Sequence, residues 1–140
     1  MTEENTARLI AMRNELEKIQ DFLEIETSDD PRELVERLAA INVYLARTGR
    51  ILAEATFIHD QEEKAAIDRI LQEYGYDLFK APPTTVRRLL QSSEPLCNFI
   101  VTLCDRLNRA CVHQGDNIRT QVSFAKEELR LTNSPYGNPR

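Results

Sequence analysis

The 140-residue chain is predicted to be all-α, with three long helices and one short helix arranged as a bundle or an extended helical hairpin. Apolar residues recur at alternating steps of three and four along most of the chain, which places them on one side of a helix. Only four glycines occur, and 41% apolar with 29% charged residues is the composition of a folded domain. We expect one helical domain over residues 1–130 and an irregular tail over residues 131–140.

The first helix is expected to begin after Thr2, because Glu3 and Glu4 would then lie at the positive end of the helix dipole. Its apolar residues form a narrow stripe, which consists of Leu9, Met12, Leu16, Ile19 and Leu23. A stripe this narrow is typical of a seam between two helices, either within this chain or with a second copy.

The second helix is predicted to run from about residue 31 to residue 74. Asp30 is placed to cap it, Pro31 is tolerated at its first position, and Gly75 is placed to end it. Its apolar positions are Leu34, Leu38, Ile41, Leu45, Leu52, Ala55, Ala66, Ile70 and Tyr74. Gly49 and the run from His59 to Gln61 are the places where this helix could bend or loosen.

A connector and a short helix are expected to follow. Residues 76–80 form the connector, and its two aromatic residues are expected to anchor it: Tyr76 and Phe79. Pro82-Pro83 stops any helix before it, and Thr84 or Thr85 is expected to cap a short helix over residues 86–90.

The last helix is predicted over Leu96–Arg130, with Ser92 or Ser93 as its cap and Glu94 in its first turn. Its apolar positions are Leu96, Ile100, Leu103, Leu107, Ala110, Ile118, Val122, Ala125 and Leu129. At 1.5 Å per residue this helix would be roughly 50 Å long, so its own chain offers it too little apolar surface and we expect a homo-oligomer. Gly115 interrupts the pattern, and we favour a tolerated defect there over a close approach by another backbone or a ligand.

Three cysteines follow the same helix at intervals of seven residues, at Cys97, Cys104 and Cys111. They are too far apart along one helix to bond each other, and no close Cys or His pair seeds a metal site. We expect buried thiols in a reducing cytoplasm, with no metal and no cofactor. The acidic and polar first residues predict no signal peptide, and no apolar run is long enough for a membrane span.

The opposite face of the last helix is largely cationic, and it is the candidate binding site. Its candidate residues are Arg106, Arg109, His113, Arg119, Ser123 and Lys126, which are called the cationic stripe below. Asp116, Thr120 and Arg130 lie on the same face. A solvated surface is the commoner fate of such charges, and contact with an anion or a phosphate is the functional alternative.

This part of the sequence resembles a family of small, mostly uncharacterised bacteriophage and prophage proteins. The residues that carry the resemblance are Arg106-Leu107-Asn108-Arg109, His113-Gln114, Arg119-Thr120, Ser123 and Lys126-Glu127-Glu128. The match covers about the last third of the chain, and Gly115 and Asn117 depart from it. The resemblance implies an origin on a mobile element and a helical fold, but it implies no activity.

His59 lies beside Asp60, Glu62 and Glu63, so it is the one candidate for a general base or a metal ligand. We prefer to interpret it as a surface histidine in an acidic helix. No phosphate-binding loop, nucleophile elbow or H-E-x-x-H motif occurs, which argues against an enzyme.

Charge adds a last constraint. The net charge is −5, which argues against a general nucleic-acid coat, and residues 1–30 alone carry −6, so the rest of the chain carries +1.

The first functional hypothesis is a cytoplasmic phage or mobile-element accessory protein that binds a host or viral protein as an adaptor, regulator or inhibitor. The alternative is an oligomer that binds a nucleotide or nucleic acid through the cationic stripe, and an enzyme using His59 is the third hypothesis.

Overall fold

The computed structural model describes residues 1–133, and helices account for nearly all of them. The elements are α1 (Glu3–Glu24), α2 (Pro31–Tyr74), the 3₁₀ helix η1 (Gly75–Lys80), α3 (Pro83–Ser93) and α4 (Pro95–Thr132). The predicted all-α class with three long helices and one short one is confirmed. Helix α4 ends two residues beyond its predicted boundary, and residues 134–140 of the predicted tail lie outside the described residues.

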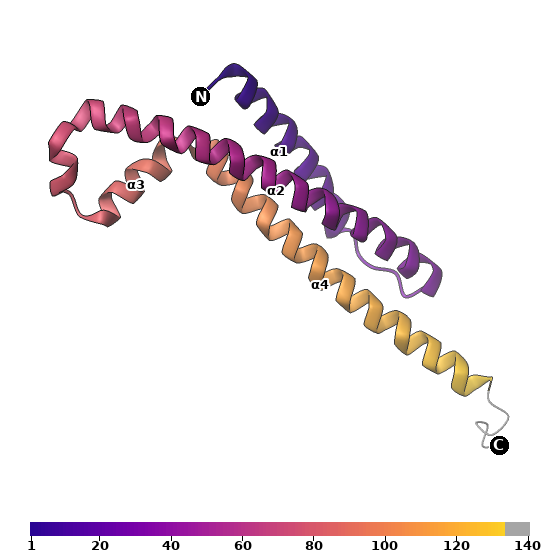
Figure 1. Cartoon of the computed structure of the whole chain (residues 1–140). Helices are drawn as coiled ribbons and strands as arrows, with labels where there is room; N and C mark the ends of the chain where they lie inside the picture. The colour runs from indigo at the N-terminus through magenta and orange to yellow at the C-terminus, as the bar shows by residue number, and fades with distance from the viewer. Residues whose placement is uncertain (134–140) are drawn as a thin grey trace.

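The two longest helices, α2 and α4, run antiparallel along an elongated molecule, and α1 packs against both (Figure 1). Asn98 bonds to His59 at one end of this pair and Arg119 bonds to Asn42 toward the other, which fixes the antiparallel direction. Helix α1 runs antiparallel to α2, from Asn5 beside Glu62 to Leu23 beside Arg37. It therefore covers the middle of the α2/α4 seam. Helix α3 folds back beside the last turns of α2 (Figure 1).

The narrow apolar stripe of α1 is confirmed as core. All five residues are buried, and they pack into one cluster with α2 and α4 of the same chain. This stripe therefore already has its partner within the chain, so a second copy is not needed to cover it.

The buried seam of α4 agrees with the predicted one at Ile100, Leu107 and Ile118, but the cysteines take the places expected for Leu96, Leu103 and Ala110. Its centre is formed by the cysteines together with Ile100, Leu107 and Ile118, whereas Leu96 and Leu103 are only half-buried. The prediction that the thiols are buried is confirmed, and they lie at the middle of the apolar stripe. A cysteine is small enough to let α4 approach α2 closely.

Local capping residues explain where α1 and α2 begin and end. The Thr2 hydroxyl accepts the Asn5 backbone N–H at 3.1 Å, and the Asp30 carboxylate accepts the Arg32 N–H at 3.1 Å. Gly75 ends α2 with a φ of 57°, a left-handed conformation that favours glycine. The predicted bounds of α2 are confirmed, and neither Gly49 nor residues 59–61 interrupts it.

The predicted caps of α3 and α4 are wrong. Helix α3 begins directly at Pro83 with Pro82 before it, so neither threonine caps it. Ser92 and Ser93 belong to the last turn of α3, where their hydroxyls donate back to the Leu89 and Leu90 carbonyls. Glu94 is then the single residue between α3 and α4, and its side chain makes no capping bond.

The predicted aromatic anchors of the connector are also wrong. Tyr76 is 87% exposed and Phe79 is 77% exposed, and their rings lie 6.4 Å apart. They form a small apolar surface with Leu71 on the outside of η1.

A cluster of hydrogen bonds fixes the end of α1. Arg37 of α2 donates to the Phe22 and Leu23 carbonyls, which are among the last carbonyls of α1. Gln114 of α4 donates to the Leu23 carbonyl at 2.9 Å and accepts from Arg37 at 3.1 Å. The Phe22 carbonyl also accepts the Ile25 backbone N–H, whereas the Leu23 carbonyl depends on these side chains, so α1 ends level with Gln114.

Within residues 1–133, no helix combines the length and the apolar character that a membrane span requires.

Candidate functional site

Beyond the end of α1, α2 and α4 continue as a pair without a third helix (Figure 1). We call this region the open end, and it consists of residues 31–36 and 119–132. Several apolar side chains of this region are not covered, since Val35 is 52% exposed, Phe124 66% and Leu129 58%. Val122 and Ala125, which were predicted to face a core, are only half-buried here.

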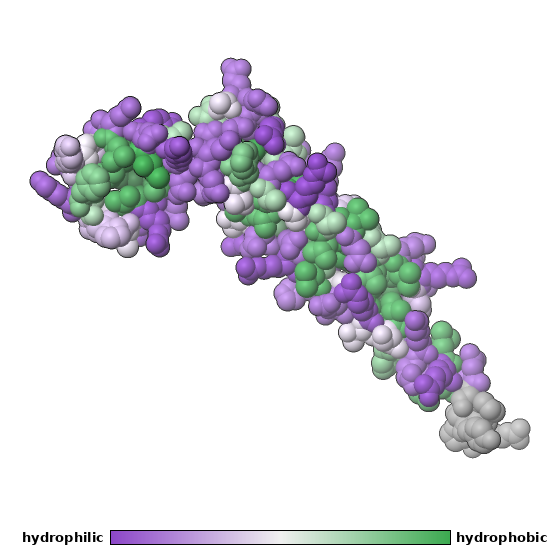
Figure 2. Space-filling view, in the orientation of Figure 1, coloured by the Kyte–Doolittle hydropathy of each residue, from purple (hydrophilic) through white to green (hydrophobic). Residues whose placement is uncertain are grey.

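Both sides of the open end are hollowed. A groove of about 430 Å³ is lined by Pro31, Arg32, Val35, Glu36, Val122, Ala125, Lys126 and Leu129. A second hollow of about 490 Å³ lies around Phe124, between Leu34 and Glu128. Hydrophobic surface follows α4 toward its C-terminal end in Figure 2. An uncovered apolar groove with a charged rim is typical of a protein contact.

The cationic stripe lies along the exposed outer face of α4, and all six of its residues are exposed. Arg109 pairs with Asp105 at 3.2 Å and Arg119 pairs with Asp116 at 3.0 Å, so acidic neighbours partly neutralise it. Arg119 also reaches the Asn42 side chain of α2 at 3.4 Å. Lys126 lines the apolar groove of the open end. The structure thus arranges the stripe as a surface and not as an enclosed site.

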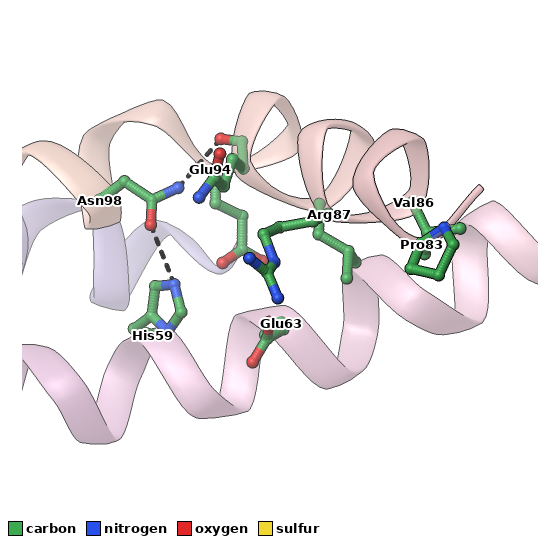
Figure 3. A pocket seen from close by; sticks show the side chains of 9 residues that line it. His59, Glu63, Pro83, Val86, Arg87, Glu94 and Asn98 are labelled. Carbon is green, nitrogen blue, oxygen red and sulfur yellow. Dashed lines mark hydrogen bonds between the residues drawn. The ribbon is translucent and has the colours of Figure 1, made fainter.

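The opposite end of the molecule, which we call the pocket end, holds a polar pocket of about 350 Å³. It lies between α2, α3 and the beginning of α4 (Figure 3). Its lining residues are His59, Glu63, Pro83, Val86, Arg87, Leu90, Gln91, Glu94 and Asn98. His59 lies half-buried in its wall and not on an open surface, because α3 and α4 fold over this part of α2.

Two buried glutamates at this end have opposite environments. Glu62 accepts a hydrogen bond from Asn5 of α1 at 2.9 Å, and this bond, with the nearby α-amino group of Met1, holds the pKa of Glu62 below its usual value. Glu94 is 7% exposed, and its Oε1 has no hydrogen-bond partner among residues 1–133. Burial therefore raises the pKa of Glu94.

The cysteines offer no nucleophile. Burial raises the pKa of Cys97 and of Cys104 to about 11, and it raises the pKa of Cys111 as well. Cys104 donates to the Thr48 carbonyl at 3.0 Å, inside the α2/α4 seam. A thiol in this setting stays protonated at neutral pH and is inert.

No protein-family model, curated protein or solved structure matches this chain. The resemblance to phage and prophage proteins therefore stays a prediction. Within its signature, Gln114 has a structural role at the end of α1, whereas His113, Ser123 and Lys126 have no such role in the core.

Sequence reasoning missed the pocket and Glu94. Glu94 was interpreted as an acid placed for the dipole of α4, and only the fold of α3 over α2 buries it. The one available signal was the position of Glu94 between Ser92-Ser93 and Pro95. A proline directly after such a polar run predicts a sharp turn.

Proposed function

We propose that this protein is a non-enzymatic binding protein that pairs with a second copy through its open end and binds a further protein through its cationic stripe. The observation that carries the proposal is the open end itself, where the apolar stripe of α4 continues past α1 without cover. Covering Val35, Val122 and Leu129 would stabilise a complex by about 25 cal/mol for each Å² of apolar surface removed from water.

A second copy is the occupant that fits the rim of the groove. Arg32 and Lys126 lie at this rim together with Glu36, and Glu128 lies beside Phe124 on the other hollow. Two-fold pairing brings the same surface of two chains together, so each cation can face an acid of the partner. Such a rim is self-complementary. The length of α4 also favours pairing with a second copy.

Apart from Lys126, which lies at the rim of the groove, the cationic stripe would then lie on the outside of the dimer, where it suits a protein with an acidic surface. Oppositely charged surfaces steer association and set its specificity. The resemblance to phage and prophage proteins favours a host or viral protein in the host cytoplasm as that partner. The protein would act on it as an adaptor, a regulator or an inhibitor.

Self-association is tested by the native mass of the purified protein, measured by light scattering over a range of concentrations. Wild type is expected to be a dimer, and Val35→Ser with Leu129→Ser is expected to be a folded monomer. Val43→Ser with Phe57→Ser is the matched control, because both residues are exposed apolar residues of α2 outside the groove. A monomeric wild type, or equal dissociation of the control, would overturn the proposal.

Partner binding is tested with Arg106→Glu, Arg109→Glu and Arg119→Glu in one chain, all outside the groove, against Arg50→Glu on α2. The partner is expected to be an acidic protein that wild type and the Arg50 variant retain and the triple variant loses, with binding that weakens as salt rises. Nucleic acid that copurifies with wild type, seen in the 260/280 nm absorbance ratio and released by salt, would favour the phosphate-binding alternative instead.

A further inference from the structure

The pocket end contains a carboxylate that the protein chain does not satisfy. Glu94 is more than nine-tenths buried, and its Oε1 has no partner among the described residues. Its side chain extends from the α3/α4 turn toward α2, into the space between His59 and Arg87 (Figure 3). A buried carboxylate without a partner is costly, and an unsatisfied group of this kind indicates an unseen ligand when a cavity lies beside it.

The hydrogen bonds around His59 fix which of its nitrogens is free. Asn98 Nδ2 donates to the Gln91 carbonyl at 2.9 Å, so Asn98 Oδ1 is the atom that faces His59. This oxygen can only accept, so the His59 Nε2–H must donate to it across 3.0 Å. In the neutral ring Nδ1 then keeps its lone pair, and it lies 3.6 Å from Asp60 Oδ1.

This arrangement is the one that metal-binding histidines use. One ring nitrogen donates to a carbonyl-type oxygen, which orients the ring, and the other nitrogen is left for the ion. The α3/α4 turn supplies the orienting bond through Asn98, which ties the conformation of His59 to the fold of α3. A solvated surface histidine has no such constraint.

Two carboxylates lie close to His59. Ligand atoms of His59, Asp60 and Glu63 all lie within 4.8 Å of one another, because residues four apart share one face of α2. Within residues 1–133, neither Asp60 nor Glu63 has a lysine or arginine nitrogen within 4.0 Å of its carboxylate. One imidazole with several carboxylates suits a first-row divalent ion such as Zn²⁺.

We propose that one divalent transition-metal ion binds at the edge of the pocket through His59 Nδ1 and the carboxylates of Asp60 and Glu63, with the buried Glu94 carboxylate nearby as a third negative group. The ion links α2 to the α3/α4 turn and compensates the charge that Glu94 otherwise buries alone. This site is independent of the open end and of the cationic stripe.

The test is calorimetric titration of the full-length protein with Zn²⁺ at neutral pH. We expect one ion per chain, a rise in melting temperature on binding, and at least tenfold weaker binding in His59→Gln and in Glu63→Gln. His59→Gln is chosen because its amide can still donate to Asn98, so the turn keeps its hydrogen bond. Glu94→Gln is expected to bind more weakly, because it lacks the third negative charge.

His113→Ala is the matched control, because His113 is the other histidine of the chain and lies exposed on α4. It is expected to bind Zn²⁺ as wild type does. Full binding by His59→Gln, or an equal loss in His113→Ala, would overturn the proposal. Co²⁺ provides a second readout, because a thiolate-to-metal absorption band would place the ion on the cysteines and would likewise overturn it.

Discussion

The two ends of this molecule are built from the same helix, α2, yet they solve opposite problems. At the open end, α4 continues past α1 and leaves apolar side chains such as Phe124 and Leu129 without cover. At the pocket end, α3 folds back and covers α2 so well that it buries the carboxylate of Glu94. One end exposes groups that water does not favour, and the other removes from water a group that needs it.

The difference follows from which element lies beside the α2/α4 pair. Helix α1 covers only the middle, because the Arg37 and Gln114 side chains bind its last carbonyls and end it there. At the pocket end a third element is present but polar, so the pocket contains unsatisfied charge. Each end therefore suits a different binding partner. Uncovered apolar surface suits a protein, and a buried carboxylate without a partner suits a cation or a proton.

The largest effect is expected from Arg37→Ala, which removes hydrogen bonds at the end of α1, where the covered middle meets the open end. Arg37 Nη2 donates to two α1 carbonyls and to Gln114, and hydrogen bonds from a charged donor contribute about 1.5–3 kcal/mol. We expect unfolding free energy to fall by about 2 kcal/mol in denaturant titration. The last turn of α1 should also lose hydrogen-exchange protection.

Arg50→Ala is the control for this change. Arg50 is exposed and pairs with Glu54 one turn away, so its loss is expected to cost less than about 0.5 kcal/mol. If both variants lost the same stability, the bonds at the end of α1 would not set where it stops.

The sequence was sufficient for features that depend on neighbouring residues. The bounds of α2 were predictable because Asp30, Pro31 and Gly75 act within one turn of the helix. The α1 stripe and the buried cysteines followed from helical periodicity in the same way. Periodicity also predicted that α4 carries apolar residues as far as Leu129, although it could not show that nothing in the chain covers them.

The features it missed depend on residues far apart in the sequence. His59 and Asn98 are 39 positions apart, and the pocket exists only because α3 returns to α2. Ser92 and Ser93 suited a helix start by residue type, but Pro95 and the sharp α3/α4 turn made them the end of the preceding helix. Tyr76 and Phe79 were expected to be anchors from their size, and only the tertiary fold leaves them outside.

A smaller and opposite effect is expected from Glu94→Gln in metal-free protein. The pKa of Glu94 is raised, so the folded state holds its proton more tightly than the unfolded chain does. Stability of wild type therefore falls as pH rises from the usual glutamate pKa, about 4.3, through the raised pKa. The variant lacks this loss, so it should be more stable than wild type at pH 7, by about 1 kcal/mol, and equal to it near pH 4.

Glu62→Gln is the matched control, since it is the other buried glutamate of the same end. The pKa of Glu62 is lowered, so its charged form stabilises the fold above the usual pKa, and this contribution is lost as pH falls through the lowered pKa. Glu62→Gln should therefore be less stable than wild type at pH 7, and the difference should shrink in acid. Thermal unfolding at several pH values checks both signs, and equal signs for the two variants would contradict the contrast between them.

The smallest effect is expected from Gly115→Ala, at the level where α1 stops and the open end begins. A Cβ on Gly115 would lie 3.7 Å from Ile41 and 3.8 Å from Leu38, which is ordinary van der Waals contact. Alanine is the better helix former, so we expect a gain of about 0.5–1 kcal/mol in thermal unfolding. The same substitution at Gly75, at the pocket end, should have the opposite sign, because its φ of 57° strains any side chain. A loss of stability in Gly115→Ala would mean that α2 and α4 approach each other at this level more closely than a methyl group allows, so the glycine would be required for their packing and would not be a tolerated defect.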